Sequence, residues 1–185
     1  MNYVTLWLTL VSAATSAAAA KAKRADTSFG LYAYGSSSGG LSLQYSNGSI
    51  YIISGDQATS GYGVVNFSTN STSPRDTGTL SIAAVSGSND TSAVGELVAI
   101  TQGINAAVEV VNNASSSQVD DEWSFFGSIL TYGGTTSNFY AVPIDDAASV
   151  FQIYWMADTS SATNGSKPVT IKKTPPPALA SPGSS

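Results

Sequence analysis

Short runs of β-branched and aromatic residues recur along most of the chain, and each run is bounded by Gly, Asn or Ser. Such runs favour strands over helices, because branched and aromatic side chains pack well on a pleated sheet. The runs occupy residues 29–34, 41–45, 50–53, 64–67, 80–85, 97–101, 108–111, 123–126, 129–132, 139–142, 151–156 and 169–172. Their spacing predicts an all-β protein, an antiparallel β-sandwich or barrel of about 10–12 short strands. No internal repeat is evident among them.

The segment 92–113 admits a second interpretation. Its apolar residues from Val94 to Thr101 also fall at helical spacing. One short helix in this segment is therefore an alternative to the strands predicted there.

The pair Asn47-Gly48 predicts a tight hairpin within residues 41–53. Asn-Gly is the preferred pair for a type I′ turn, whose twist matches that of the flanking strands. This turn sets Tyr45 opposite Ile50 on one face of the hairpin, and Gln44 opposite Tyr51 on the other. The turn chemistry and the apolar alternation agree on this register.

Gly133-Gly134 indicates a second turn, between the runs at residues 129–132 and 139–142. A longer loop that pairs Tyr132 with Phe139 and Leu130 with Ala141 buries more apolar surface than a two-residue turn. We therefore expect a hairpin with the longer loop here.

His and Cys are both absent from the sequence. Ser-His-Asp and Cys-His catalysis, thiol chemistry and ordinary zinc sites are therefore excluded. Neither a metal site nor a cofactor is predicted. Downstream of Arg24, four basic side chains face twelve acidic ones. Without a basic patch, neither nucleic acid nor a membrane surface is expected as a partner.

The two ends of the chain differ in composition from its middle. An apolar run at residues 3–11 and small residues at 12–20 predict a signal peptide over residues 1–20 and hence a secreted, extracellular protein. The dibasic pair Lys23-Arg24 resembles a processing site, and cleavage there would remove a propeptide ending at residue 24. A single β domain is expected over residues 25–173. Three prolines begin a Pro/Ser-rich tail at residues 174–185, which we expect to be disordered.

Asn-x-Ser/Thr sequences that can accept N-linked glycans are more frequent than chance would give. They lie at Asn47, Asn66, Asn70, Asn89, Asn113 and Asn164. Each occupied site must face solvent. The sequence thus predicts an N-glycosylated protein.

Several segments resemble a group of uncharacterised secreted proteins of filamentous ascomycete fungi. The resemblance lies in Ser28–Gly35, in Gly40-Leu41 with the Asn47-Gly48 hairpin and Tyr51, in Asn138–Pro143, in Phe151–Trp155 and in Lys167–Lys172. It covers most of the chain after Arg24, except residues 54–121. It implies secretion and a β-rich fold, and it implies no activity and no catalytic residue.

Four aromatic residues are candidates for ligand contact: Tyr32, Tyr34, Tyr62 and Trp123. Tyr32 and Tyr34 alternate with apolar neighbours and so share a face, while Tyr62 lies in a Gly-rich turn. Exposed aromatic rings stack on sugar rings, which suggests carbohydrate binding. For Tyr32 and Tyr34, core or interface packing is the favoured interpretation, since most aromatic residues of a β protein pack in this way. Trp155 is assigned to the core.

Acidic residues offer the remaining chemistry. Asp56, Asp120-Asp121-Glu122 and Asp145-Asp146 are the candidates for a carboxylate pair. A glycoside hydrolase would need two of them facing each other about 5–10 Å apart. Solvated loop acids are the plainer interpretation, since exposed acids are the rule. No residue is assigned a catalytic role.

Two functional hypotheses follow from these features. The first is a secreted, N-glycosylated fungal protein that acts by binding or structural presence at a cell wall or host surface, with a polysaccharide or glycan as partner. The second is a carboxylate-dependent glycoside hydrolase. The sequence does not indicate an oligomeric state.

Overall fold

The computed structural model describes residues 28–35, 38–55, 60–71, 73, 76–87, 91–145 and 149–177. Strands dominate these residues, and their pairings are antiparallel. The strands are β1 (Phe29–Gly30), β2 (Tyr32–Gly35), β3 (Ser38–Ser42), β4 (Gln44–Ser46), β5 (Ser49–Ile53), β6 (Gly63–Thr69), β7 (Leu80–Ser86), β8 (Leu97–Thr101), β9 (Ala106–Ala107), β10 (Glu109–Val111), β11 (Gln118–Val119), β12 (Trp123–Phe126), β13 (Ile129–Tyr132), β14 (Phe139–Pro143), β15 (Val150–Trp155) and β16 (Lys167–Lys172). The 3-10 helix η1 (Thr159–Ser161) follows β15. The all-β prediction is confirmed. Within these ranges, no helix is long and apolar enough to cross a membrane.

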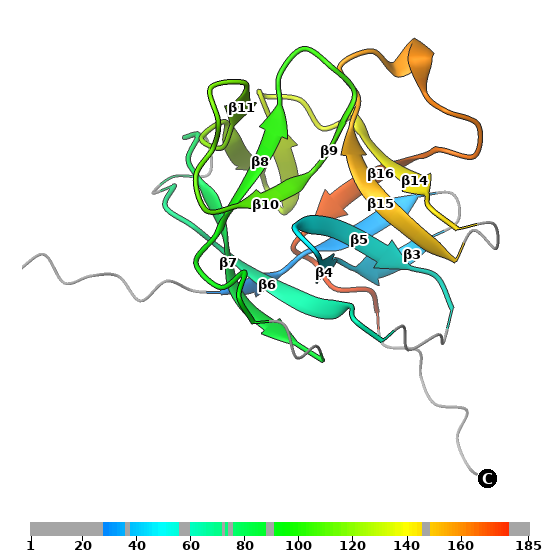
Figure 1. Ribbon diagram of the computed structural model, residues 1–185, viewed down its shortest axis with the longest axis horizontal. Coiled ribbons are helices and arrows are strands. Elements are labelled where there is room, and N and C mark those ends of the chain that lie inside the picture. Colours follow the sequence, from blue (N-terminus) through cyan, green and yellow to red (C-terminus); the bar gives the residue numbers. More distant parts are fainter. Residues whose placement is uncertain are drawn as a thin grey trace, which may run out of the picture.

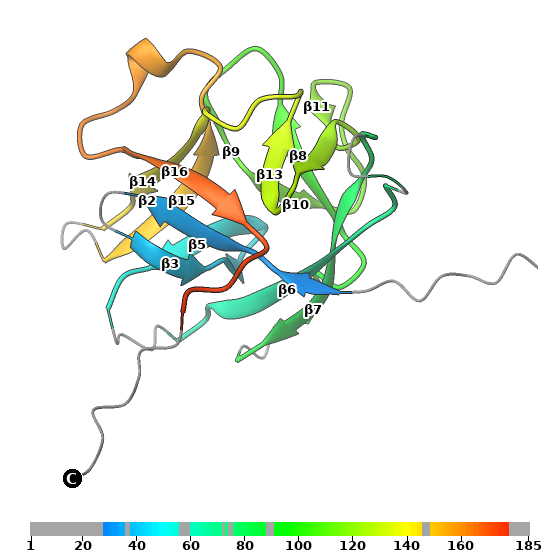
Figure 2. The same ribbon diagram turned by 180° about the vertical axis from the view of Figure 1, so that it is seen from behind.

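A barrel forms the centre of the fold. The segment β1–β2 pairs with β6 on one side and with β16 on the other. From β6 the pairing continues to β7, and from β16 it continues through β13 to β12. A single bridge between Gly78 and Trp123 joins the β7 side to the β12 side and closes the ring. Figure 2 shows β2 and β16 side by side on this barrel.

Three hairpins cover one end of the barrel. They are β4–β5, β8–β10 and β14–β15. The hairpins also pair with one another, β5 with β15, β10 with β5, and β9 with β15 (Figure 1). Each of the units β1–β6, β7–β12 and β13–β16 thus supplies two barrel strands and one hairpin. This threefold arrangement is the topology of a β-trefoil.

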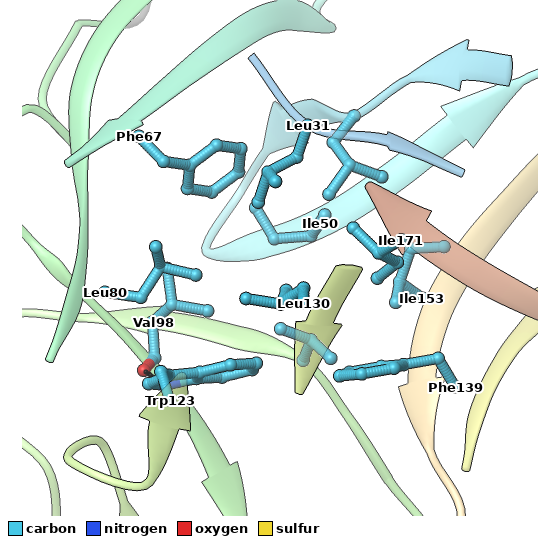
Figure 3. A pocket seen from close by; sticks show the side chains of 12 residues that line it. Leu31, Ile50, Phe67, Leu80, Val98, Trp123, Leu130, Phe139, Ile153 and Ile171 are labelled. Atoms are coloured by element: carbon cyan, nitrogen blue, oxygen red, sulfur yellow. Dashed lines mark hydrogen bonds between the residues drawn. The ribbon is translucent and has the colours of Figure 1, made fainter. Parts of the chain in front are cut away.

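The barrel interior is filled by apolar side chains, four from each unit. They are Leu31, Leu43, Ile50 and Phe67, then Leu80, Val98, Val108 and Trp123, then Leu130, Phe139, Ile153 and Ile171. Figure 3 shows these side chains converging on one point. The cavity between them measures about 10 Å³, roughly the space of one water molecule. Ligand sites of enzymes and carriers are far larger, so the interior is a packed core.

The Asn47-Gly48 hairpin has the predicted register. Both turn residues have positive φ, 45° and 77°, as a type I′ turn requires. Tyr45 pairs with Ile50, and Gln44 pairs with Tyr51. Tyr45 and Ile50 are buried, so the apolar face points inward as expected.

Two local predictions are wrong. Gly133-Gly134 does not join a hairpin, because β13 pairs with β12 and β16, while β14 pairs with β15 and β16. These partners satisfy the apolar faces of both strands, so burial alone could not select the hairpin. The short helix considered within residues 92–113 is also wrong, because its helical spacing falls on β8, whose Val98, Ala99 and Ile100 are buried on both faces.

The predicted ends of the domain are tested only in part. The signal peptide, Lys23 and Arg24 lie outside the described residues. The first residues of the predicted tail are described by the structure, where Thr174 and Pro176 contact β2 and β3.

Candidate functional site

Trp123 is not a ligand contact. Its side chain is 1% exposed, and its indole Nε1 donates a 2.8 Å hydrogen bond to the Val98 carbonyl. Its ring stacks on that of Phe139, with the centroids 6.2 Å apart. Trp123 points inward because β12 alternates, with Trp123 and Phe125 on the buried face. The prediction for this residue is therefore wrong.

Tyr32 and Tyr34 lie on the outer face of the barrel, as their alternation with buried Leu31 and Ala33 indicates. Both are half-buried, and each ring has a neighbour within the protein. The Tyr34 hydroxyl donates to the Thr174 carbonyl at 2.8 Å. A Cβ atom added at Gly30 would lie 3.0 Å from the Tyr32 hydroxyl, so that side chain covers Gly30. Neither ring is a free platform for a ligand.

Tyr62 belongs to an outward-facing aromatic pair. Its ring meets Tyr51 of β5 edge to face, with centroids 5.1 Å apart and planes at 86°. The side chain of Tyr51 faces outward because its neighbours Ile50 and Ile52 are buried. Both tyrosines are partly exposed. The structure thus adds Tyr51 to the predicted Tyr62.

Two glutamines flank Tyr51 on neighbouring strands. Gln44 of β4 pairs with Tyr51, and Gln152 of β15 pairs with it from the other side. Directly paired residues of antiparallel strands point to the same face, so the three side chains form one row. Strands lie about 4.8 Å apart, which places the two glutamines about 10 Å from each other. Within the described part of the chain, neither glutamine side chain hydrogen-bonds to another protein group.

Asp145 lies beside this row. Burial raises the pKa of Tyr62, and the charges of Tyr51 and Asp145 raise it further. A hydrogen bond from the Ser149 hydroxyl lowers the pKa of Asp145, as does one from the Val150 N–H at 3.1 Å. Asp145 is therefore an anion held by hydrogen bonds from Ser149 and Val150, at the edge of the Gln44–Tyr51–Gln152 row.

The threefold topology supplies two rows equivalent to this one. In the second unit the row is Ala99, Glu109 and Ser49, and in the third it is Tyr140, Tyr154 and Ala107. Neither contains an amide side chain. Of these three rows, only that of the first unit has an amide side chain on each side of an aromatic ring.

Among the predicted acids that the structure describes, Glu122 and Asp145 lie too far apart to form a catalytic pair. Glu122 lies next to Gly133, at the end of β14 where Phe139 packs on Trp155. Asp145 follows the opposite end of β14, a strand of five residues that spans about 13 Å. Asp56 and Asp146 lie outside the described residues. No group of three acidic side chains in the described ranges is arranged to hold a metal ion.

The predicted glycan acceptors are placed on the surface where the structure describes them. Asn47, Asn70, Asn113 and Asn164 are exposed, and Asn66 is half-buried on the outer face of β6. Asn89 lies outside the described residues. The Asn70 side-chain oxygen also accepts a 2.7 Å hydrogen bond from the Thr79 N–H. The occupancy of all six acceptors stays a prediction.

The chain matches no protein-family model, no curated protein and no solved structure. The site therefore rests on its own geometry. Sequence reasoning identified Tyr62 as a candidate but did not identify Gln44, Tyr51 and Gln152. The signal was present in the Asn47-Gly48 register, which already sets Gln44 against Tyr51 on the face away from the core.

Proposed function

We propose that this protein is a secreted, N-glycosylated binding protein whose ligand is a neutral carbohydrate of a cell wall or host surface. The observation that carries the proposal is the Gln44–Tyr51–Gln152 row with Tyr62 beside it. The filled barrel interior favours a ligand held on the outer surface. The signal-peptide pattern and the glycan acceptors support the secreted route.

The row offers the groups that a sugar needs. A sugar ring has apolar C–H edges and a rim of hydroxyls that both donate and accept hydrogen bonds. The rings of Tyr51 and Tyr62 present apolar surface to the C–H edges of the sugar. A Gln amide can donate hydrogen bonds to the sugar hydroxyls and accept hydrogen bonds from them. Asp145 would accept a further hydrogen bond from a sugar hydroxyl and would repel an anionic sugar. A neutral ligand follows from that charge.

A binding assay with purified protein tests the proposal. We expect retardation in affinity gels that contain soluble β-glucan, mannan or chitin oligosaccharides, for at least one of these. Tyr51→Ala should abolish the retardation, because it removes the centre of the row. Gln44→Ala and Gln152→Ala should each weaken binding roughly threefold to tenfold, the worth of one hydrogen bond.

The equivalent row in the third unit provides the matched control. Tyr140→Ala removes an outward, half-buried tyrosine from a hairpin of the same kind, but from a row without amides. It should leave binding unchanged. Binding to none of the carbohydrates would contradict the function, and equal losses in Tyr51→Ala and Tyr140→Ala would contradict the site. The dispersed acids give the glycoside hydrolase alternative no comparable support.

A further inference from the structure

The chain returns onto its own barrel after β16. Figure 2 shows residues 173–177 doubling back beside β3. The Tyr34 hydroxyl donates to the Thr174 carbonyl at 2.8 Å, immediately before three consecutive prolines. This contact joins residues that are 140 positions apart in the sequence.

Gly40 provides the space for the second prolyl residue. A Cβ atom added at Gly40 would lie 2.8 Å from the Tyr34 ring and 2.9 Å from Pro176 Cβ. Gly40 is also buried and has a φ of +100°, which side-chain-bearing residues disfavour. The Tyr34 ring and Pro176 therefore meet over a bare stretch of backbone in β3. The ammonium of Lys172 lies 5.1 Å from the centroid of the same ring and helps to hold it in place.

These contacts are those by which proteins recognise extended proline-rich segments. Consecutive prolines adopt the polyproline II conformation before they bind, so little entropy is lost on docking. They lack N–H groups, and recognition depends on aromatic rings that meet the prolyl rings and on donors to the carbonyls. Tyr34 supplies both the ring and the donor.

We infer that Tyr34, Gly40 and Lys172 form a docking site for extended proline-rich segments of partner proteins, which the chain's own Thr174–Pro177 segment occupies. The segment follows Lys173 directly, so its effective concentration at the site is millimolar or higher. A partner segment of equal affinity must exceed that concentration, or the tail must first be cut. The site is separate from the Gln44–Tyr51–Gln152 row and does not depend on carbohydrate binding.

A peptide titration tests this inference. The probe is the capped peptide Thr-Pro-Pro-Pro-Ala, added to isotope-labelled protein and followed by the backbone amide signals of Tyr34 and Gly40. In a chain that ends at Lys173, we expect these signals to shift and to saturate at high-micromolar to millimolar peptide. In the full chain at the same peptide concentrations they should not move. Unmoved signals in the shortened chain, or equal shifts in both chains, would overturn the inference.

A second pair of variants tests the site in both the full chain and the shortened chain. In the full chain, Tyr34→Phe removes the hydroxyl that holds the Thr174 carbonyl, so the Thr174 amide should gain fast motion in relaxation measurements. In the shortened chain, Tyr34→Phe should weaken the peptide about twofold to tenfold, the worth of one hydrogen bond. Tyr32→Phe is the control, since its hydroxyl makes no contact with Thr174–Pro177 that the structure describes. Wild-type behaviour of Tyr34→Phe, or an equal effect of Tyr32→Phe, would overturn the assignment.

Discussion

Trp123→Phe should destabilise the protein by about 3 kcal/mol and leave carbohydrate binding unchanged. Two losses add up to this figure. The Val98 carbonyl loses a buried 2.8 Å hydrogen bond from the indole, at a cost of about 1–2 kcal/mol. The smaller ring also removes two carbon atoms from a filled interior, which costs about 1.5 kcal/mol.

Urea unfolding followed by far-ultraviolet circular dichroism measures this cost. For a domain of this size, about 3 kcal/mol corresponds to a fall in Tm of roughly 6–12 °C. Trp155→Phe is the matched control, because Trp155 is also buried but its indole makes no hydrogen bond within the described part of the chain. It should lose only the packing contribution, about 1.5 kcal/mol.

The comparison of the two variants separates the packing contribution from the hydrogen bond. Equal costs for Trp123→Phe and Trp155→Phe would mean that the bond to Val98 adds nothing. A cost below about 1 kcal/mol for Trp123→Phe would refute the placement of Trp123 in the core. Loss of carbohydrate retardation in a folded Trp123→Phe protein would restore Trp123 as a ligand contact.

Three further substitutions test other parts of the fold. Gly48→Ala should cost about 1–2 kcal/mol in urea unfolding because φ is +77° there, whereas Gly39→Ala, at an exposed position with no neighbour within 4 Å, should cost little. Burial, with the charges of Glu122 and Asp121, raises the pKa of Tyr132 to about 12, and its hydroxyl has no hydrogen-bond partner among the residues that the structure describes. Unfolded tyrosine ionises near pH 10, so the free energy of unfolding of the wild type should fall from about pH 10 to pH 12. In Tyr132→Phe it should fall less over this range, and at pH 7 the variant should be at least as stable as the wild type. A steeper fall in the variant would contradict this. A hydrogen bond from the Ser149 hydroxyl lowers the pKa of Asp145, so the Tm of the wild type should fall as the pH drops through the range where an unfolded Asp protonates. The Tm of Asp145→Asn should fall less between pH 5 and pH 2. An equal fall in the variant would mean that the Asp145 carboxylate does not stabilise the fold.

Local features of the fold could be predicted from the sequence. The bounds of β8, β12 and β13 agree with the predicted runs, because glycine or polar residues interrupt the apolar residues on both sides. The Asn47-Gly48 hairpin could be predicted to the residue, since its turn type requires two positive φ angles and tolerates one register. Strand bounds and turn type could both be predicted because they depend on residues only a few positions away in the sequence.

Strand partners distant in sequence could not be predicted. The neighbours of β13 are β12 and β16, and the second of these begins 35 positions after β13 ends. Pairing β13 with β14 would bury the same kind of apolar face, so the alternation of residues does not distinguish the two solutions. The closure of the barrel distinguishes them, because β16 must bridge β13 and β2 for the ring to close.

The candidate residues show how far a face can be deduced from alternation. Alternation put Tyr32 and Tyr34 on one face of their strand and Leu31 and Ala33 on the other, and the structure shows that the tyrosine face is the outer one. The same argument was available for Trp123, which shares a face with Phe125 and not with Ser124. The face that an aromatic side chain occupies is thus stronger evidence for or against a ligand contact than its residue type.

The threefold symmetry is visible in the structure and not in the sequence because the fold constrains few positions in each unit. The core requires an apolar side chain at each equivalent point, and Phe67, Trp123 and Ile171 satisfy the same requirement with three different shapes. The outer rows are less constrained, since all of their side chains except Ala99 are partly exposed. This freedom explains how one unit can carry the Gln44–Tyr51–Gln152 row while its equivalents carry none of its amides. A binding site on this fold is therefore best sought where the three units differ on their surface, and the symmetry-related residue is the natural control for each substitution.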